Sequence, residues 1–183
     1  MYKHYILAGI FVTLSLPGAF ASGHNNTVVT LPGGELNFIG DVIDAACLVD
    51  IDSRKQEIRL DQVNNAQFTA SGSSVSAAPF SIQLNNCSVT TSQSVGISFI
   101  GVADERDPTI LATITERNMA NGVGIALFDA DNNLLPINAP PKDFSLLSRG
   151  TNTLHFFAKY RSTLPVVTSG SSNAAANFMV TYQ

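Results

Sequence analysis

The residues best suited to covalent chemistry are two cysteines, Cys47 and Cys87. Such a pair can form a disulfide, act as a redox couple or supply half of a zinc site. No C-x-x-C motif occurs, and beyond the N-terminal leader (residues 1–21) the only histidines are His24 and His155. An oxidising compartment would join the cysteines of an exported chain. We therefore predict one disulfide, whose loop of about 40 residues contributes roughly 4 kcal/mol in the chain-entropy model.

Motifs for catalysis and for metal binding are weak. No G-x-S-x-G nucleophile motif occurs, and His155 stands on the polar face of an expected strand. The stretch DADNN at 129–133 begins like a calcium loop, but Leu134 replaces the turn glycine and Pro140 the bidentate glutamate, which favours a hairpin turn. The GVG at 122–124 lacks the rest of a dinucleotide fingerprint. We predict no catalytic residue, no metal, no cofactor and no small-molecule substrate.

The first 21 residues have the layout of a secretory signal. Lys3 provides a positive start, Ile6 to Leu16 is almost continuously apolar, and Ala19-Phe20-Ala21 forms a cleavage site. The apolar run is shorter than the roughly 20 residues needed to span a bilayer. We therefore predict export of a mature chain long enough for one domain with its own core. The chain's 14 acids and 10 scattered bases, one of which is Lys3 in the leader, argue against a nucleic-acid partner.

The rest of the chain divides into short apolar or alternating runs between turn residues. This pattern predicts an all-β sandwich. The expected strands cover residues 47–51, 57–63, 80–84, 94–101, 122–129, 153–161 and 175–182. Residues 68–79 are small and polar and predict a surface loop, whereas residues 104–119 could contain a helical turn or two.

The two ends of the mature chain carry the strongest pattern. In GELNFIGDVID, residues Leu36, Phe38, Gly40 and Val42 lie on one face of a predicted strand. A glycine in the middle of such a face usually marks a place where another backbone or side chain comes close. This strand precedes the disulfide-anchored body, and nothing in the sequence obliges it to fold back. At the other end, residues 174–182 contain neither a charge nor a proline, so they would form an unprotected strand edge.

These features together resemble the structural subunits of chaperone–usher fimbriae, the type 1 pilin family. The resemblance covers nearly the whole chain. It rests on the signal peptide, GGELNFIGDVIDAAC, PFSIQLNNC, GVGIALFD followed by LPIN, LHFFAKYR, a glycine fourteenth from the C-terminus and a penultimate tyrosine. Within the family, TLPGGELNFIG, GVAD and AKYR are most similar to a minor subunit of type 1 fimbriae.

The resemblance implies an incomplete immunoglobulin-like β-sandwich that lacks its last strand. It implies a signal peptide at 1–21, an N-terminal donor-strand extension at 22–44 and a pilin domain at 45–183. A periplasmic chaperone would fill the open groove until the extension of the next subunit replaces it, a form of β-strand addition. The expected partners are this chaperone, an outer-membrane usher and neighbouring subunits, and the expected location is a fimbrium on the cell surface.

The resemblance also assigns roles to single residues. Donor side chains are expected from Leu36, Phe38 and Val42, with Gly40 at a pocket too shallow for a side chain. The chaperone and usher pathway is expected to use a second set at the C-terminus, Gly170, Phe178, Val180, Tyr182 and Gln183.

Three other functions remain to be separated from this one. A carbohydrate-binding tip adhesin would resemble two domains, a lectin joined to a pilin domain, without a donor extension. An exported enzyme would need a catalytic constellation. A self-contained secreted β-sandwich would pair the N-terminal strand within its own body, giving a stable monomer with a protected N-terminus.

Overall fold

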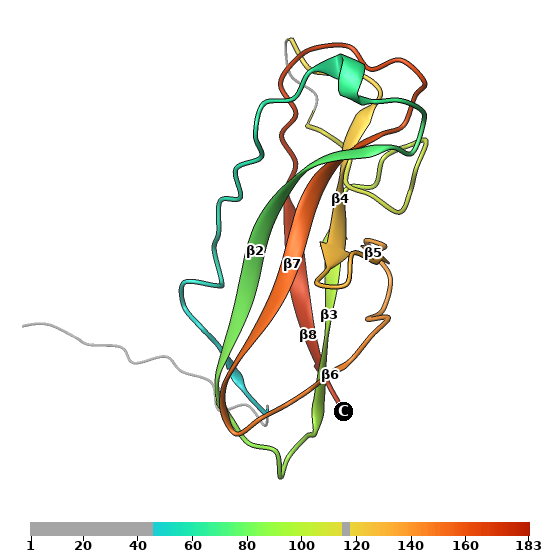
Figure 1. Cartoon of the computed structure of the whole chain (residues 1–183). Helices are drawn as coiled ribbons and strands as arrows, with labels where there is room; N and C mark the ends of the chain where they lie inside the picture. Colours follow the sequence, from blue (N-terminus) through green and yellow to red (C-terminus); the bar gives the residue numbers. More distant parts are fainter. Residues whose placement is uncertain (1–45, 115–117) are drawn as a thin grey trace, which may run out of the picture. The chain divides into compact units, whose positions relative to one another are not determined.

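The computed structural model describes residues 46–114 and 118–183, which lie within one compact unit of the chain, Val42–Gln183 (Figure 1). The predicted donor residues Leu36, Phe38, Gly40 and Val42, and the boundaries expected at residues 21 and 44, lie outside the described residues.

The described residues form eight strands in two antiparallel sheets. One sheet has the order β1-β2-β7-β4-β5, and the other has the order β6-β3-β8. The strands are β1 (Leu48–Val49), β2 (Ser74–Cys87), β3 (Ser94–Gly101), β4 (Val123–Asp129), β5 (Leu134–Leu135), β6 (Ser145–Leu146), β7 (Gly150–Ser162) and β8 (Ala176–Tyr182). A single turn of 3-10 helix, η1, covers Asn65–Gln67.

The core lies between the two sheets, and period-2 alternation places its residues. On β7, Phe156 and Ala158 are buried where the sequence pattern predicted the inward face, whereas His155 is exposed. Phe156 stacks on Phe80 and meets Phe99 edge-on, both with ring centroids 5.4 Å apart. These aromatic pairs join β7 and β2 to β3 of the opposite sheet. The all-β sandwich predicted from the sequence is therefore confirmed.

Two local predictions are confirmed. A disulfide joins Cys47 and Cys87, and both residues are almost completely buried. The stretch at 129–133 forms the hairpin turn between β4 and β5, in which the Asp129 carboxylate accepts a hydrogen bond from the Asn133 backbone and Asn132 has a φ of +65°. Asparagine tolerates this left-handed conformation better than most residues.

Other strand bounds differ from the sequence prediction. Residues 74–79, expected in a loop, belong to β2, because their pairing with β7 continues past a bulge between Val75 and Ala77. Residues 57–63, expected as a strand, have no strand partner among the described residues. No helix forms in 104–114, where Leu111 instead exchanges two backbone hydrogen bonds with Ile125 of β4. Each difference reflects long-range pairing that a local pattern cannot reveal.

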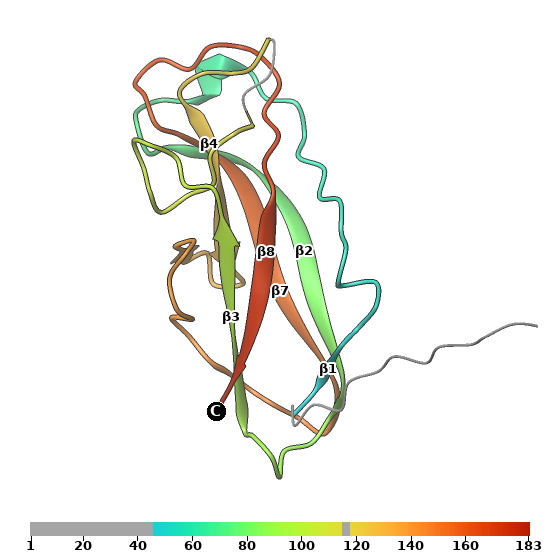
Figure 2. The same cartoon turned by 180° about the vertical axis from the view of Figure 1, so that it is seen from behind.

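The sheet edges differ greatly in length. Edge strands β1, β5 and β6 contain two residues each, whereas the edge strand β8 contains seven. Short edge strands limit pairing with other chains, and a long uncharged edge invites it. The candidate site therefore lies beside β8, whose only sheet partner among the described strands is β3, next to it in Figure 2.

Candidate functional site: an open groove beside the last strand

A groove opens between β8 and residues 53–60, which we call the wall segment. Its main part has a volume of about 780 Å³ and is lined by the wall segment, residues 172–178 and core residues Phe80, Ile82, Phe99, Leu111, Ile125, Leu127, Ala158 and Tyr160. A second part of about 500 Å³ lies between residues 47–49 and β8, and Arg54 lines both parts. The groove thus reaches the core of the sandwich along β8, where Phe80 and Tyr160 are partly exposed and the other core residues that line it are buried.

The backbone of β8 can bond a further strand. Ser94 and Gln183 exchange both backbone hydrogen bonds, at 2.9 and 3.0 Å. In an antiparallel pair such residues alternate with residues whose N–H and C=O point away from the partner strand. In the register that pairs Val95 with Tyr182, the outward groups belong to Phe178, Val180 and Tyr182. Within residues 46–114 and 118–183, the outward backbone groups of these three residues have no backbone partner, so they present a hydrogen-bonding edge to the groove.

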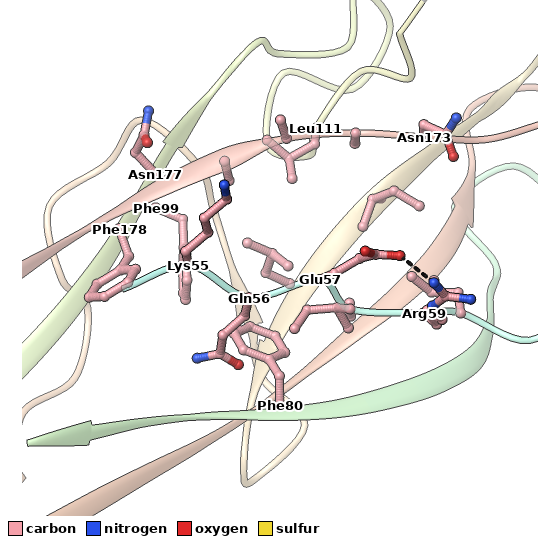
Figure 3. A pocket seen from close by; sticks show the side chains of 18 of the residues that line it. Lys55, Gln56, Glu57, Arg59, Phe80, Phe99, Leu111, Asn173, Asn177 and Phe178 are labelled. Carbon is pink, nitrogen blue, oxygen red and sulfur yellow. Dashed lines mark ion pairs between the residues drawn. The ribbon is translucent and has the colours of Figure 1, made fainter. Parts of the chain in front are cut away.

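The wall segment is held by side chains more than by its backbone. From Lys55 to Val63, no backbone–backbone hydrogen bond forms with another described residue. Ile58 and Leu60 pack against the core, and the Gln56 amide donates to the Ser81 carbonyl at 2.8 Å. Figure 3 shows Lys55 and Gln56 pointing to opposite sides of the segment. The wall therefore also retains backbone groups that could bond an inserted strand.

The β8 side of the groove is graded in side-chain size. Along one row, the residues are small at Ser172, Ala174 and Ala176 and large from Phe178 onward through Val180 and Tyr182. The hydroxyl of Ser172 is buried and has no hydrogen-bond partner among the described residues. Buried polar groups are normally paired. An occupant of the groove could supply the missing acceptor.

Tyr182 ties the end of β8 to Cys47, which lines the second part of the groove. Its hydroxyl donates a hydrogen bond to the Cys47 carbonyl at 3.2 Å, and Cys47 is joined to Cys87 at the end of β2. Partial burial raises the pKa of the Tyr182 hydroxyl above its ordinary value. The neighbouring Gln183 accepts backbone hydrogen bonds from Gln93 and Ser94. The last two residues are thus fixed in place at this end of the groove.

Gly170 lies before β8, apart from the row of predicted chaperone contacts. A Cβ atom there would lie 2.2 Å from the backbone nitrogen of Ala120 and 2.2 Å from the carbonyl carbon of Met119. The neighbouring Ser171 bonds to both Asn118 and Ala120 through the backbone. The structure therefore gives this glycine a packing role: it lets residues 118–120 approach the segment that leads into the groove.

We expect Gly170→Ala to lower the free energy of unfolding by about 1–3 kcal/mol, because backbone atoms cannot yield to the added methyl group. Urea unfolding would measure the loss. Gly150→Ala is a suitable comparison, since Gly150 has a φ of +95° but no atom within 4 Å of its would-be Cβ. Equal losses in the two variants would mean that backbone conformation, and not the close approach, accounts for the effect at Gly170.

The polar residues of the described chain give no sign of an active site. His155 is exposed on β7, and no group of three His, Cys, Asp or Glu residues within 46–114 and 118–183 could hold a metal. The partly buried pair of Arg161 and Asp107, 3.1 Å apart, joins β7 to the loop after β3. Burial of Asp107 opposes its ionisation, but hydrogen bonds from Thr109 and the charge of Arg161 lower its pKa overall. In the part of the chain that the structure describes, no helix is long and apolar enough to cross a membrane.

Sequence reasoning located one side of the groove and missed the other. Phe178, Val180 and Tyr182 were identified by their alternation, and all three line the groove. The pattern at residues 57–63, which overlaps the wall segment at 57–60, predicts an ordinary sheet strand. The only available signal was its alternation of apolar Ile58 and Leu60 with charged neighbours, which does not distinguish a paired strand from an unpaired groove wall.

Comparisons with known proteins agree with this architecture. The model of the family "Fimbrial protein" matches residues 36–183. The chain is 37% identical to the probable major fimbrial subunit LpfA of Escherichia coli O157:H7, over 82% of this chain and 84% of that protein. It is 33% identical to the type 1 fimbrial subunit of Salmonella typhimurium, over 99% and 100% of the two chains.

A solved structure gives the same fold. A subunit from a chaperone–usher pilus, solved to reveal the basis of rod uncoiling, superimposes with a TM-score of 0.66 at 27% identity, covering 85% of this chain and all of that one. The open sandwich, the disulfide, the family match and the full-length relatives lead to one conclusion. The chain belongs to the fimbrial protein family, the pilin subunits of chaperone–usher pili.

Proposed function

We propose that this protein is a structural subunit of an adhesive fimbria, assembled by donor-strand exchange, in which its groove receives the extension of another subunit. The observation that carries the proposal is the edge of Phe178, Val180 and Tyr182, whose outward backbone groups bond no other described residue, beside a groove with apolar core residues at its base. An inserted strand would bond this edge through its backbone and fill the groove with alternate side chains. Each large buried side chain would contribute roughly 1.5–3 kcal/mol by area transfer.

The same proposal assigns both ends of the chain. Residues 1–21 direct export to the periplasm, and residues 22–44 form the donor extension, with Leu36, Phe38, Gly40 and Val42 facing the groove of the preceding subunit. A periplasmic chaperone occupies the groove of residues 45–183 first, contacting Phe178, Val180, Tyr182 and the Gln183 carboxylate. An outer-membrane usher then presents the complex for exchange, and the fibre forms on the cell surface.

A finer proposal is that the chain is a minor subunit, similar to the type 1 fimbrial subunit FimI. It rests on the stretches TLPGGELNFIG, GVAD and AKYR. The relatives described above include a probable major subunit, so the number of copies per fibre is the decisive quantity. Quantitative mass spectrometry of purified fibres would measure it, and a copy number equal to that of the rod subunit would exclude the minor role.

Hydrogen exchange tests the proposed groove occupancy directly. We expect the amides of Phe178, Val180 and Tyr182 to exchange rapidly in the mature chain alone and to slow by at least about a hundredfold in assembled fibres, because an inserted strand bonds them. The amides of Asn177, Met179 and Thr181, which face β3, serve as internal controls. Protection of all six amides in the isolated monomer would contradict the proposal and indicate a self-contained sandwich.

A further inference from the structure

The described strands of the three-stranded sheet contain no charged residue. Strands β6, β3 and β8 have the sequences SL, SVGISFIG and ANFMVTY. The chain as a whole carries 14 acids and 10 bases. On the other sheet, alternation along β7 turns Lys159 and Arg161 to the outer face. The outer face of the three-stranded sheet is therefore an uncharged surface on a charged molecule.

Three large apolar side chains form a row on this uncharged face. Alternation on β3 turns Ile100 outward, where it is 44% exposed, and Val102, two residues further on, is 74% exposed. Met179 of β8 is 55% exposed. It lies diagonally across the strand pair from Ile100, because Met179 pairs with Ser98. We call Ile100, Val102 and Met179 the outer row.

Another part of the same face is already covered. A Cβ atom at Gly96 would lie 2.6 Å from the Pro141 Cβ and 2.9 Å from the Phe144 ring, so the segment between β5 and β6 packs directly on β3 there. The outer row has no such cover among the described residues, as its exposure shows. Large apolar side chains that gather on a surface and stay uncovered are typical of a protein contact.

We infer that the outer row is a self-complementary contact, through which two copies of this chain pair with their three-stranded sheets face to face. Each copy has a formal net charge of −4, so two copies approach at the least electrostatic cost through an uncharged face. Other large apolar residues that are exposed, including Leu48 and Val166, lie outside this sheet. The same row on a second copy therefore fits best, and such a pair has two-fold symmetry.

This contact goes beyond the proposed function, because it does not involve the groove. The groove uses the outward edge of β8 and its inward side chains Phe178, Val180 and Tyr182, whereas the outer row uses the opposite face. Copies in a fibre built by strand exchange all point the same way, and a two-fold axis across the fibre reverses that direction. Face-to-face pairs would therefore join separate fibres, where many weak contacts add.

The test measures self-association of the full mature chain with an excess of labelled peptide of residues 33–46, which blocks strand exchange between copies. Sedimentation equilibrium should show monomers and dimers at chain concentrations up to about 1 mM, the range of weak contacts. The dimer should not weaken between roughly 50 mM and 500 mM NaCl, because the contact contains no charge. Val102→Lys/Met179→Lys should weaken it at least about tenfold, because the contact would bury unpaired charges.

Ile51→Lys/Val166→Lys is the matched control. These two residues are 77% and 74% exposed outside the sheet, so the same change in net charge should leave the dimer unaltered. Val102→Thr/Met179→Thr removes apolar surface without adding charge, and threonine suits a strand. It should weaken the dimer at least about threefold. Equal midpoints of urea unfolding would show that each variant folds.

The outcomes separate this inference from the proposed function, because native electrophoresis reports peptide binding in the same samples. If the peptide binds and the chain stays monomeric at every concentration, strand exchange stands and face-to-face pairing is wrong. A dimer that both lysine pairs weaken equally also contradicts the inference. If the peptide does not bind and only the changes in the outer row weaken the dimer, the inference stands and the proposed function is wrong.

Discussion

A subunit with Gly40→Leu is expected to fold and accept a donor strand normally, yet to insert its own extension into another subunit about tenfold to a hundredfold less well. Gly40 is proposed to face the groove of the preceding subunit. Phe80, Phe99 and Phe178 already line that groove. Adding a large side chain to a packed interior costs about 1–3 kcal/mol, and each 1.4 kcal/mol changes an equilibrium about tenfold. Incorporation of tagged subunits into fibres would measure the effect.

Asn37→Leu is the matched control for this variant. It adds the same residue three positions earlier, on the face of the strand that alternation directs away from the groove, and it should be incorporated like the natural chain. Deletion of residues 22–44 gives the reference for complete loss, since such a chain should still bind a chaperone but not add to a preceding subunit. Normal incorporation of the Gly40→Leu chain would show that residue 40 does not face the groove.

Loss of the disulfide is expected to lower the free energy of unfolding by about 4 kcal/mol, because a loop of about 40 residues becomes free in the unfolded chain. Natural domains are stable by only about 5–15 kcal/mol. The bond also fixes Cys47, which accepts the Tyr182 hydrogen bond and lines the second part of the groove. Urea unfolding of Cys47→Ala/Cys87→Ala beside the natural chain would measure the loss.

Reduction of the natural chain provides the control. Dithiothreitol should shift the unfolding midpoint of the natural chain close to that of the double variant, and it should leave the double variant unchanged. Hydrogen exchange should show the largest loss of protection at β1 and the end of β2, where Ser88 donates to the Ala46 carbonyl. Coinciding midpoints for the oxidised natural chain and the double variant would contradict the structural role of the bond.

A strand could be predicted from the sequence where apolar and polar residues alternate, because one face of the strand is buried and the other is exposed. The pattern of Leu154, Phe156, Ala158 and Tyr160 correctly placed β7 because one face of it packs on the core. The pattern failed for residues 74–79, SVSAAP, which are mostly small yet pair with β7. Backbone pairing needs no large side chain, so such an extension leaves little trace in the sequence.

The sequence by itself determined the disulfide, the all-β class, the face of β8 that lines the groove and the glycine in the predicted donor strand. These features depend on residue identity and local alternation. Only the tertiary structure decided that residues 53–60 form a groove wall, whose residues from Lys55 onward make no backbone–backbone hydrogen bond to another described residue. It also decided that Gly170 lets residues 118–120 pack closely and that Tyr182 reaches Cys47. These arrangements join residues distant in the sequence, and their geometry depends on how the two sheets pack.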